Sequence, residues 1–281
     1  MGNVTRYGAA VLLGVTPALL LAMTMAAAAD LLRVRPRRWA VRAAPWAAES
    51  ALLLVAYAAW QQGLGVVADH TRGAAAHGLA VWRVERSLHL VKEATVQRWV
   101  LGTPALMRGL NYYYAVGHVQ DVIAVLAWSF WRHRDRYLDA RRALVALIGS
   151  CALVQAVPVA PPRLLPATGV VDAGRLLGYA LYPLGGLRDS SQLTAMPSVH
   201  VAMALWATVT VVSLSSSPWR WLMLVHLAVT VAAVIAPGYH FWLDGLVAAG
   251  LLIIVRGGQW LTGTAQHRHI QMSEDRPIMN V

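Results

Sequence analysis

Seven stretches of the chain are apolar along most of their length, and each is long enough, or nearly so, to cross a membrane as a helix. A hydrocarbon core about 30 Å thick requires about 20 apolar helical residues. The pattern therefore predicts an all-α integral membrane protein. Its predicted spans are residues 8–30, 45–68, 111–131, 143–160, 197–214, 221–236 and 240–257.

The few charged residues predict which side of the membrane each connection occupies. Hydrophobic residues make up 58% of the chain and charged residues only 13%, against roughly a quarter charged in soluble proteins, which excludes a soluble enzyme. The net charge of +11 comes from 23 Arg and one Lys, with five Arg in each of the connections 33–42 and 132–142. Cations bunched between apolar spans indicate the cytoplasmic side rather than a nucleic-acid-binding surface. The long connections 69–110 and 161–196 are then expected to face outward.

The outward connection 69–110 is too polar to span a membrane. Its apolar residues, such as Leu79 and Trp82, are interspersed with cations such as Arg83 and Arg86. This pattern predicts outward amphipathic helices that lie on the membrane surface. Two interpretations stay open: a solvated loop with some helix, and a lid over a site at the outer leaflet.

The N-terminal apolar stretch has two interpretations. Arg6, an apolar run and the alanines 26–29 are also typical of a secretory signal with a small-residue cleavage site. Cleavage there would invert the orientation of every later span, whereas an uncleaved run is long enough to be an anchor, which is the interpretation adopted. The lone cysteine, Cys151, allows no disulfide framework and no cysteine-based metal site within one chain.

A histidine lies where the second outward connection becomes the fifth span, in the run Met-Pro-Ser-Val-His that ends at His200. Pro197 suits a first helical turn, because its missing N–H would be unpaired there anyway. Ser198 and the free N–H groups beside it then predict an anion site, aided by the positive end of the helix dipole. His200 would face that anion. The alternative is a histidine that only forms a hydrogen bond at a helix start.

A second histidine begins the seventh span at the same predicted membrane face. His240 and Asp244 are four residues apart, so both lie on one side of a helix about 6 Å apart. A carboxylate there can accept one ring N–H, fix the tautomer and raise the nucleophilicity of the other nitrogen. The alternative is a polar pair that only stabilises the helix end.

An arginine leaves the fourth span at that face as well. Arg163 lies in a segment with four prolines, which makes a rigid and extended exit from the span. A guanidinium suits bidentate phosphate binding, so Arg163 is a candidate phosphate ligand. The alternative is an ordinary arginine whose charge reaches the interface.

Together these residues resemble the motifs of the type-2 phosphatidic acid phosphatase superfamily, which also includes vanadium haloperoxidases. Pro197 to His200 matches the motif Pro-Ser-x-His, and His240 to Asp244 matches His-x-x-x-Asp. The resemblance covers about residues 143–257 and implies a six-helix bundle, here with one extra N-terminal span. It also implies roles: His240 attacks phosphorus, Asp244 orients His240, and His200 protonates the leaving group. No metal and no cofactor are implied.

The chain departs from that family at two cations. Lipid phosphatases have a Lys seven residues before an Arg-Pro pair, where this chain has Ala156, Arg163 and Leu164. Their third motif has an Arg six residues before the nucleophile, where this chain has Val234. Such loss is nearer to the inositol phosphorylceramide synthase-like (inositolphosphotransferase) branch, which transfers a phosphorylated headgroup between lipids. A phosphodiester carries less charge than a terminal phosphate, so fewer cations would suffice.

Other polar residues are candidates for contact with the substrate. Asn111, Tyr114, His118 and Asp121 recur at spacings of three and four and predict a polar seam along the third span. This seam either lines a headgroup or acceptor site or only holds the bundle together by hydrogen bonds. Further candidate headgroup contacts in the outward connections are Glu85, Arg175, Arg188, Asp189, Ser190 and Gln192.

The sequence thus predicts a membrane enzyme that cleaves or transfers the phosphoryl group or phospho-headgroup of a lipid phosphate at the outer face of the plasma membrane. Its expected partners are the lipid phosphate substrate, the surrounding membrane lipids and an acceptor, which is either water or a lipid alcohol. No nucleic-acid partner is expected. The predicted division is an anchor and basic loop (1–44), a catalytic membrane domain (45–257) and a cytoplasmic tail (258–281). The alternative function is a non-catalytic lipid-phosphate transporter or binding protein, or a haem-binding bundle with His118 and His226 as ligands.

Overall fold

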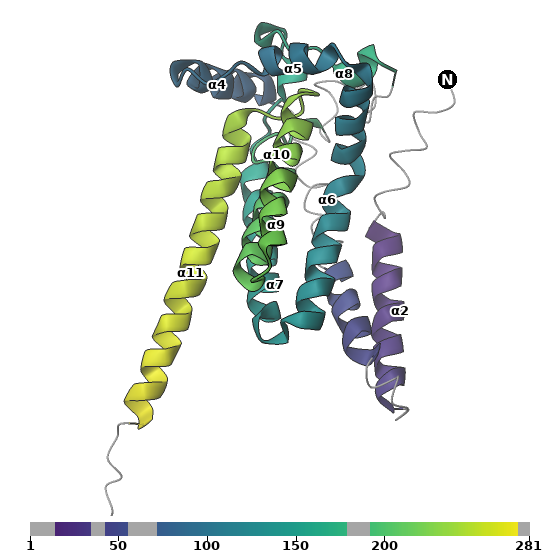
Figure 1. The fold of residues 1–281 in the computed structure, drawn as a ribbon, viewed down its shortest axis with the longest axis vertical. Helices are drawn as coiled ribbons and strands as arrows, with labels where there is room; N and C mark the ends of the chain where they lie inside the picture. Colours follow the sequence, from purple (N-terminus) through teal and green to yellow (C-terminus); the bar gives the residue numbers. More distant parts are fainter. Residues whose placement is uncertain (1–14, 35–42, 56–71, 179–191, 275–281) are drawn as a thin grey trace, which may run out of the picture.

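The computed structural model describes residues 15–34, 43–55, 72–178 and 192–274, and these ranges are predominantly helical (Figure 1). They contain no β-strand, only an isolated bridge between Val159 and Thr194. The all-helical prediction is therefore confirmed for the described residues. The elements are α2 (Val15–Val34), a helix over Ala43–Val55, α4 (Ala74–Ser87), α5 (Glu93–Leu101), α6 (Pro104–Arg132), α7 (Arg134–Gln155), η1 (Pro162–Leu164), η2 (Pro166–Thr168), α8 (Ala173–Leu176), α9 (Val199–Leu214), η5 (Pro218–Trp221), α10 (Leu222–Ile235) and α11 (Trp242–Glu274).

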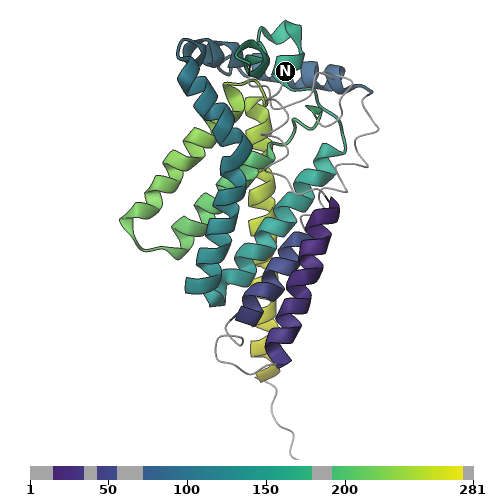
Figure 2. The ribbon, with the colours of Figure 1, turned by 90° about the vertical axis from the view of Figure 1, so that its right-hand side faces the viewer.

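The long helices form a bundle around α9, which packs against α6, α7, α10 and α11. The short helices α4, α5 and α8 lie across one end of this bundle (Figures 1 and 2). The turn between α6 and α7 lies at the opposite end, beyond which α11 continues. The first residues of α9 and α11, which carry the two histidine motifs, lie at the end covered by α4 and α5.

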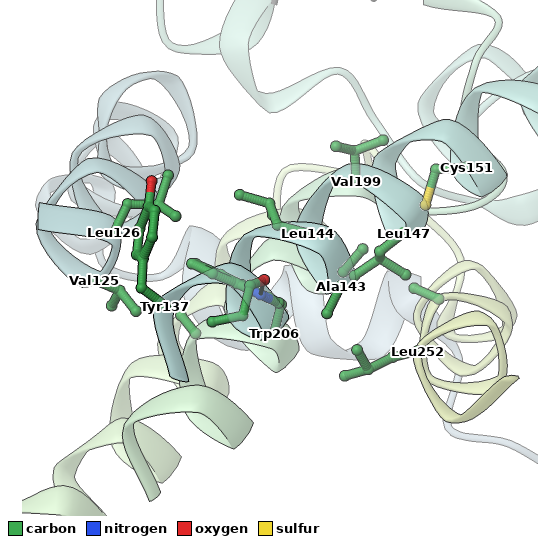
Figure 3. Packing of buried hydrophobic residues seen from close by; sticks show 14 of the residues in the cluster. Val125, Leu126, Tyr137, Ala143, Leu144, Leu147, Cys151, Val199, Trp206 and Leu252 are labelled. Carbon is green, nitrogen blue, oxygen red and sulfur yellow. Dashed lines mark hydrogen bonds between the residues drawn. The ribbon is translucent and has the colours of Figure 1, made fainter. Parts of the chain in front are cut away.

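The core of the bundle is built from aromatic and aliphatic side chains of α6, α7, α9 and α11 (Figure 3). Trp206 is its largest buried side chain, and its indole N–H donates to the carbonyl of Ala140 over 2.8 Å. Because a buried indole N–H without an acceptor would be costly, this bond fixes how α9 faces α7. Small residues such as Ala143 and Ala202, both fully buried, let the helices approach closely.

The helix bounds differ from the predicted spans mainly at the ends. α6 begins at Pro104 rather than at 111, and α7 begins at Arg134 rather than at 143. The arginine-rich connection 132–142 is therefore a break at His133 between two helices whose charged ends are exposed. α11 runs to Glu274, beyond its predicted span and into the segment predicted as a tail. A hydropathy pattern detects only the apolar part of a helix, so polar first and last turns are missed.

Within the described residues, two helical stretches are long and apolar enough to cross a membrane, Pro218–Ile235 and Trp242–Thr262. Shorter apolar helices cover Leu20–Leu31, Ala43–Val55 and Val199–Leu214. The count of six spans plus one therefore stays a prediction. Residues 56–68 of the predicted second span lie outside the described ranges.

The helix over Ala43–Val55 is joined to the bundle by a polar contact. The carboxylate of Glu49 accepts from the guanidinium of Arg141 on α7 over 2.7 and 2.8 Å. The same carboxylate accepts from the hydroxyl of Tyr137 over 2.6 Å. Such a two-oxygen contact fixes geometry as well as charge, so it determines where this helix meets α7.

Candidate active site

The three segments predicted to carry chemistry meet at one end of the bundle and are joined by backbone hydrogen bonds. The N–H of Arg163 donates to the carbonyl of Gly238 over 3.2 Å, which joins the exit of α7 to the entry of α11. The N–H of Ser198 donates to the carbonyl of Asp244 over 3.1 Å, which joins the entries of α9 and α11. The structure therefore brings Arg163, Ser198, His200, His240 and Asp244 together.

The imidazole of His240 is held through one nitrogen. Its Nδ1 lies 2.7 Å from the carbonyl oxygen of Ala195 and 3.2 Å from Oδ2 of Asp244. Because a carbonyl can only accept, Nδ1 must carry the proton, and the neutral ring then has its lone pair on Nε2. The predicted pairing with Asp244 is present, but the shorter contact is to Ala195, which sequence reasoning did not identify. His240 is 5% exposed and Asp244 is fully buried.

The carboxylate of Asp244 is held by the backbone just before α11. Its Oδ2 accepts from the N–H of Phe241 over 2.9 Å as well as facing His240. The carboxylate thus bridges the backbone before α11 and the imidazole ring. This arrangement fixes the distance between the two side chains independently of helix periodicity.

Gly238 makes the turn before His240 possible. Its φ of +81° is in the left-handed region, and a Cβ there would lie 2.5 Å from Cγ1 of Val170 and 3.1 Å from Cβ of Arg163. Both the conformation and the space require glycine. The turn thus permits the close approach of Arg163 to the segment that carries His240.

The entry of α9 differs from the predicted anion site in two respects. Ser198 is the N-cap, so Pro197 precedes the helix rather than lying in its first turn. The N–H of Ser198 is used by Asp244, and its Oγ accepts from the N–H of Val201 over 3.4 Å. The hydroxyl proton of Ser198 therefore remains as its donor. His200, on the first turn, has its ring centroid 6.2 Å from that of His240.

Arg163 is buried in the 3₁₀ turn η1, with 8% of its surface exposed. Its Nη2 donates to Oε1 of Gln192 over 2.9 Å, and its Nε lies 3.7 Å from Oδ2 of Asp172. Asp172 also faces Arg175, at 3.3 Å. Two neighbouring polar groups thus hold the guanidinium at the site, and Gln192 and Arg175, predicted as headgroup contacts, belong to this network.

Four flat groups stack in a column across the site. The ring of Tyr114 lies between the imidazole of His200 (centroids 4.0 Å apart) and the ring of Tyr239 (4.3 Å). The guanidinium carbon of Arg163 lies 4.6 Å from the centroid of Tyr239. The hydroxyl of Tyr239 donates to Oδ1 of Asn111 over 2.6 Å. The two predicted contacts on α6, Asn111 and Tyr114, therefore act on protein groups of the site, and Tyr239 is a site residue that sequence reasoning missed.

The other end of the predicted polar seam on α6 has different neighbours. Asp121 lies 3.5 Å from Nε2 of His226 on α10 and 3.4 Å from the hydroxyl of Tyr113. The hydroxyl of Tyr113 also lies 2.7 Å from Nδ1 of His226. This second polar cluster joins α6 to α10, as the bundle-holding interpretation expects. The side chain of His118 and the residues Arg188, Asp189 and Ser190 lie outside the described residues.

Glu85 was predicted to be a headgroup contact on an amphipathic helix, but the structure buries it completely. Its Oε1 accepts from the N–H of Leu243 over 2.8 Å, next to Asp244. Periodicity could not reveal this contact, because the partner is 158 residues away along the chain. In the described part of the chain, no group of three or more His, Cys, Asp or Glu could hold a metal ion.

Comparison with known protein families shows which family the chain belongs to. The model of the PAP2 superfamily matches residues 79–257, which is most of the chain and includes all three motif segments. The chain therefore belongs to the PAP2 superfamily. Membership indicates phosphatase or phosphotransferase activity in general terms. The comparisons with curated proteins and with solved structures found no match.

Proposed function

We propose that this chain is a membrane enzyme that cleaves or transfers the phosphoryl group or phospho-headgroup of a lipid phosphate through a phosphohistidine intermediate. The observation that carries the proposal is the pairing of Nδ1 of His240 with Ala195 and Asp244. It leaves Nε2 as the nucleophilic nitrogen of a neutral imidazole that cannot easily rotate.

In this mechanism Nε2 of His240 attacks phosphorus, and the bond between phosphorus and the leaving oxygen breaks. His200 donates its proton to that oxygen, so the alcohol leaves neutral. The phosphorylated imidazole keeps its Nδ1 proton and becomes cationic, and the carboxylate of Asp244 stabilises this charge. Water or a lipid alcohol then attacks phosphorus, passes its proton to His200 and releases Nε2.

Among the residues that the structure describes, the groups that stabilise the phosphoryl oxygens are few. Arg163 and the hydroxyl of Ser198 are the candidates at the site. Where lipid phosphatases have a third-motif arginine, Val234 is buried in an apolar cluster with Met107 and Leu110. The two missing family cations, at Ala156 and Val234, make the site suit a phosphodiester better than a terminal phosphate dianion. This supports the inositolphosphotransferase-like branch and headgroup transfer.

The docking of α4 and α5 supports transfer for a second reason. These helices lie across the end of the bundle where α11 begins, and Glu85 on α4 contacts Leu243 next to Asp244. His240, Asp244 and Ser198 are buried. Burial that excludes bulk water favours an acceptor that arrives with the lipid. Of the two interpretations of the connection 69–110, the docking of α4 and α5 therefore favours a lid over the site rather than a solvated loop.

We further propose that the site faces the periplasm or cell exterior. Arg132, Arg134 and Arg136 are exposed at the turn between α6 and α7, at the end of the bundle opposite to α4 and α5. Arg33 lies in the last turn of α2, at that same end. If these cations lie in the cytoplasm, the site opens at the other membrane face.

The test is a turnover assay of the purified protein on a panel of labelled lipid phosphates and phosphodiesters, with and without lipid alcohols and EDTA. We expect His240→Ala to abolish both turnover and acid-labile labelling of the protein. His133→Ala, at the far end of the bundle, is the matched control and should retain both. Turnover by His240→Ala equal to that of the control would refute the mechanism. If the wild-type protein turned over none of the lipids, a transporter or binding protein would be favoured.

A further inference from the structure

A carboxyl group from outside the motifs caps α11, the helix that carries Asp244 and begins two residues after His240. The N–H of Leu243, in the first turn of α11, has no partner within its own helix, as is general for such groups. Oε1 of Glu85 on α4 accepts from it over 2.8 Å. Leu243 is followed directly by Asp244, so the contact is one residue from the group that orients His240.

The capping carboxyl is part of a fully buried acidic pair. Glu85 and Glu93 are 0% and 1% exposed. Oε2 of Glu85 and Oε1 of Glu93 have no hydrogen-bond donor among the described residues, apart from what one carboxyl can give the other. Nη2 of Arg86 lies 3.8 Å from Glu85 and 3.6 Å from Glu93. One proton shared between Oε2 of Glu85 and Oε1 of Glu93 satisfies both oxygens. The pair then carries one negative charge, which the guanidinium of Arg86 balances.

Burial and the neighbouring Glu93 raise the pKa of the Glu85 carboxyl to about 8. The N–H of Leu243 acts in the opposite direction, and Asp244 adds to the increase. The charged and titratable groups facing Glu85 are thus Arg86 on its own helix, Glu93 on α5 and Asp244 on α11. A protonated Glu85 still accepts from Leu243 through its carbonyl oxygen.

The helix that carries Glu85 is itself fixed to the site. Gly78 on α4 lies so close to the exit of α7 that a Cβ there would be 2.5 Å from the carbonyl oxygen of Ala160. Nδ1 of His77 lies 2.8 Å from the carbonyl of Pro158. On α5, Gln97 donates to the carbonyl of Ala236, just before the turn to His240. Glu85 therefore contacts α11 from a fixed support rather than from a mobile loop.

From this arrangement we propose that Glu85 is a positioning residue for the pair His240 and Asp244. The inference rests on the proposed function of His240. Glu85 contacts none of the reacting atoms and acts through the N–H of Leu243, which holds the first turn of α11. If that turn shifts, Oδ2 of Asp244 moves from its place 3.2 Å from Nδ1, and the imidazole loses its orientation. The buried acidic pair thus couples the cover formed by α4 and α5 to the nucleophile.

Two substitutions of nearly the same size test the proposal. Glu85→Gln keeps an oxygen for Leu243 and supplies an N–H to Glu93, whereas Glu85→Leu does neither. We expect Glu85→Leu to lower kcat by about 100-fold, as small misplacements of catalytic groups do, with little change in KM. We expect Glu85→Gln to stay near wild type. Asp135→Asn, which removes an exposed carboxylate at the start of α7, is the control.

Hydrogen exchange of residues 242–246 provides a measurement that needs no substrate. Glu85→Leu should speed exchange there, and Glu85→Gln should not. Equal kcat and equal exchange in the two variants would overturn the positioning role, even with His240→Ala inactive. If His240→Ala stays active, the proposed function fails, while exchange still decides whether Glu85 holds α11.

A pH comparison covers the case in which Glu85→Leu does not fold. Above about pH 8 the wild-type pair loses its shared proton, whereas Glu85→Gln keeps its neutral amide. The ionised Glu85 still accepts from Leu243, but it is now repelled by the charges of Glu93 and Asp244, and this repulsion displaces the first turn of α11. The ratio of kcat for Glu85→Gln to kcat for wild type should therefore rise above that pH, and a constant ratio would overturn the coupling of Glu85 to the nucleophile.

Discussion

The imidazole of His200 and the ring of Tyr114 stack face to face, with centroids 4.0 Å apart and planes inclined by 18°. Tyr114 comes from α6, whereas His200 comes from the first turn of α9. The ring centroids of His200 and His240 lie 6.2 Å apart. The stack is thus a restraint on His200 that does not depend on His240.

Loss of this stack should impair the proposed acid. Tyr114→Leu removes an aromatic contact of about 1 kcal/mol, which corresponds to about fivefold in rate. Tyr114→Phe keeps the ring and should lose less. The measurement is kcat/KM of both variants on one lipid substrate. Equal losses in Phe and Leu would assign the effect to the hydroxyl instead of the stack.

Gly238 should tolerate no side chain. Gly238→Ala places a Cβ at positive φ and 2.5 Å from Val170, which should destabilise the fold by about 2–4 kcal/mol. Gly250→Ala on α11 meets no atom within 4 Å and is the matched control. Thermal unfolding in detergent compares them. A Tm for Gly238→Ala equal to that of the control would contradict the geometry of the turn.

Glu85 should make the folding stability depend on pH. Its pKa is about 8 in the folded protein, against an ordinary value of 4.5. Between these values the folded state holds a proton that the unfolded state has released, so this contribution to stability falls as pH rises from about 4.5 to about 8. Unfolding midpoints of wild type minus those of Glu85→Gln should fall over that range and level off above it. A difference that rises with pH would contradict the protonated pair.

The choice between water and alcohol should depend on the docking of α5. The amide of Gln97 donates to the carbonyls of Val171 and Ala236 and accepts from the N–H of Val171. Gln97→Leu removes these bonds at similar size and should raise the ratio of hydrolysis to transfer. Arg98→Gln changes an exposed neighbour on the same helix and should leave the ratio unchanged. If both activities fall together in Gln97→Leu, α5 collects substrate and does not exclude water.

The two histidines predict a bell-shaped dependence of kcat/KM on pH. His240 must be neutral to attack and His200 must be protonated to donate, and only a limited pH range satisfies both. The limbs belong to the coupled pair and not to either residue alone. A flat profile between about pH 5 and 9 would argue against this division of roles.

The sequence predicted the helical class because apolar runs specify helices locally. It predicted the convergence of the motif residues from the alternation of the spans across the membrane and from the family resemblance. The predicted helical face shared by His240 and Asp244 was wrong in detail, because His240 lies before α11 and meets Asp244 through the preceding turn. The sequence did not predict Ala195 as the partner of Nδ1, because any residue supplies the same carbonyl. Nor did it predict Tyr239 in the column, since a buried phenol shows no period.

Glu85 shows most clearly which contacts the sequence could not predict. On an amphipathic helix a glutamate is expected to face solvent, and only the tertiary fold reveals a partner at Leu243. The predicted spans were also shorter than the helices at Pro104, Arg134 and Glu274. Charged end turns carry no apolar signal, so the hydropathy pattern ends before the helix does.

The contact between Glu49 and Arg141 has a consequence for the biosynthesis of the chain. The two residues are 92 positions apart, so a ribosome makes the helix over Ala43–Val55 well before it makes α7. Until α7 emerges, Glu49 lacks the guanidinium and the Tyr137 hydroxyl that it contacts in the finished protein. An unpaired carboxylate in apolar surroundings is unstable, so this helix completes its docking only after α7 is in place. This early part of the chain therefore reaches its final position only after α7, which is synthesised later.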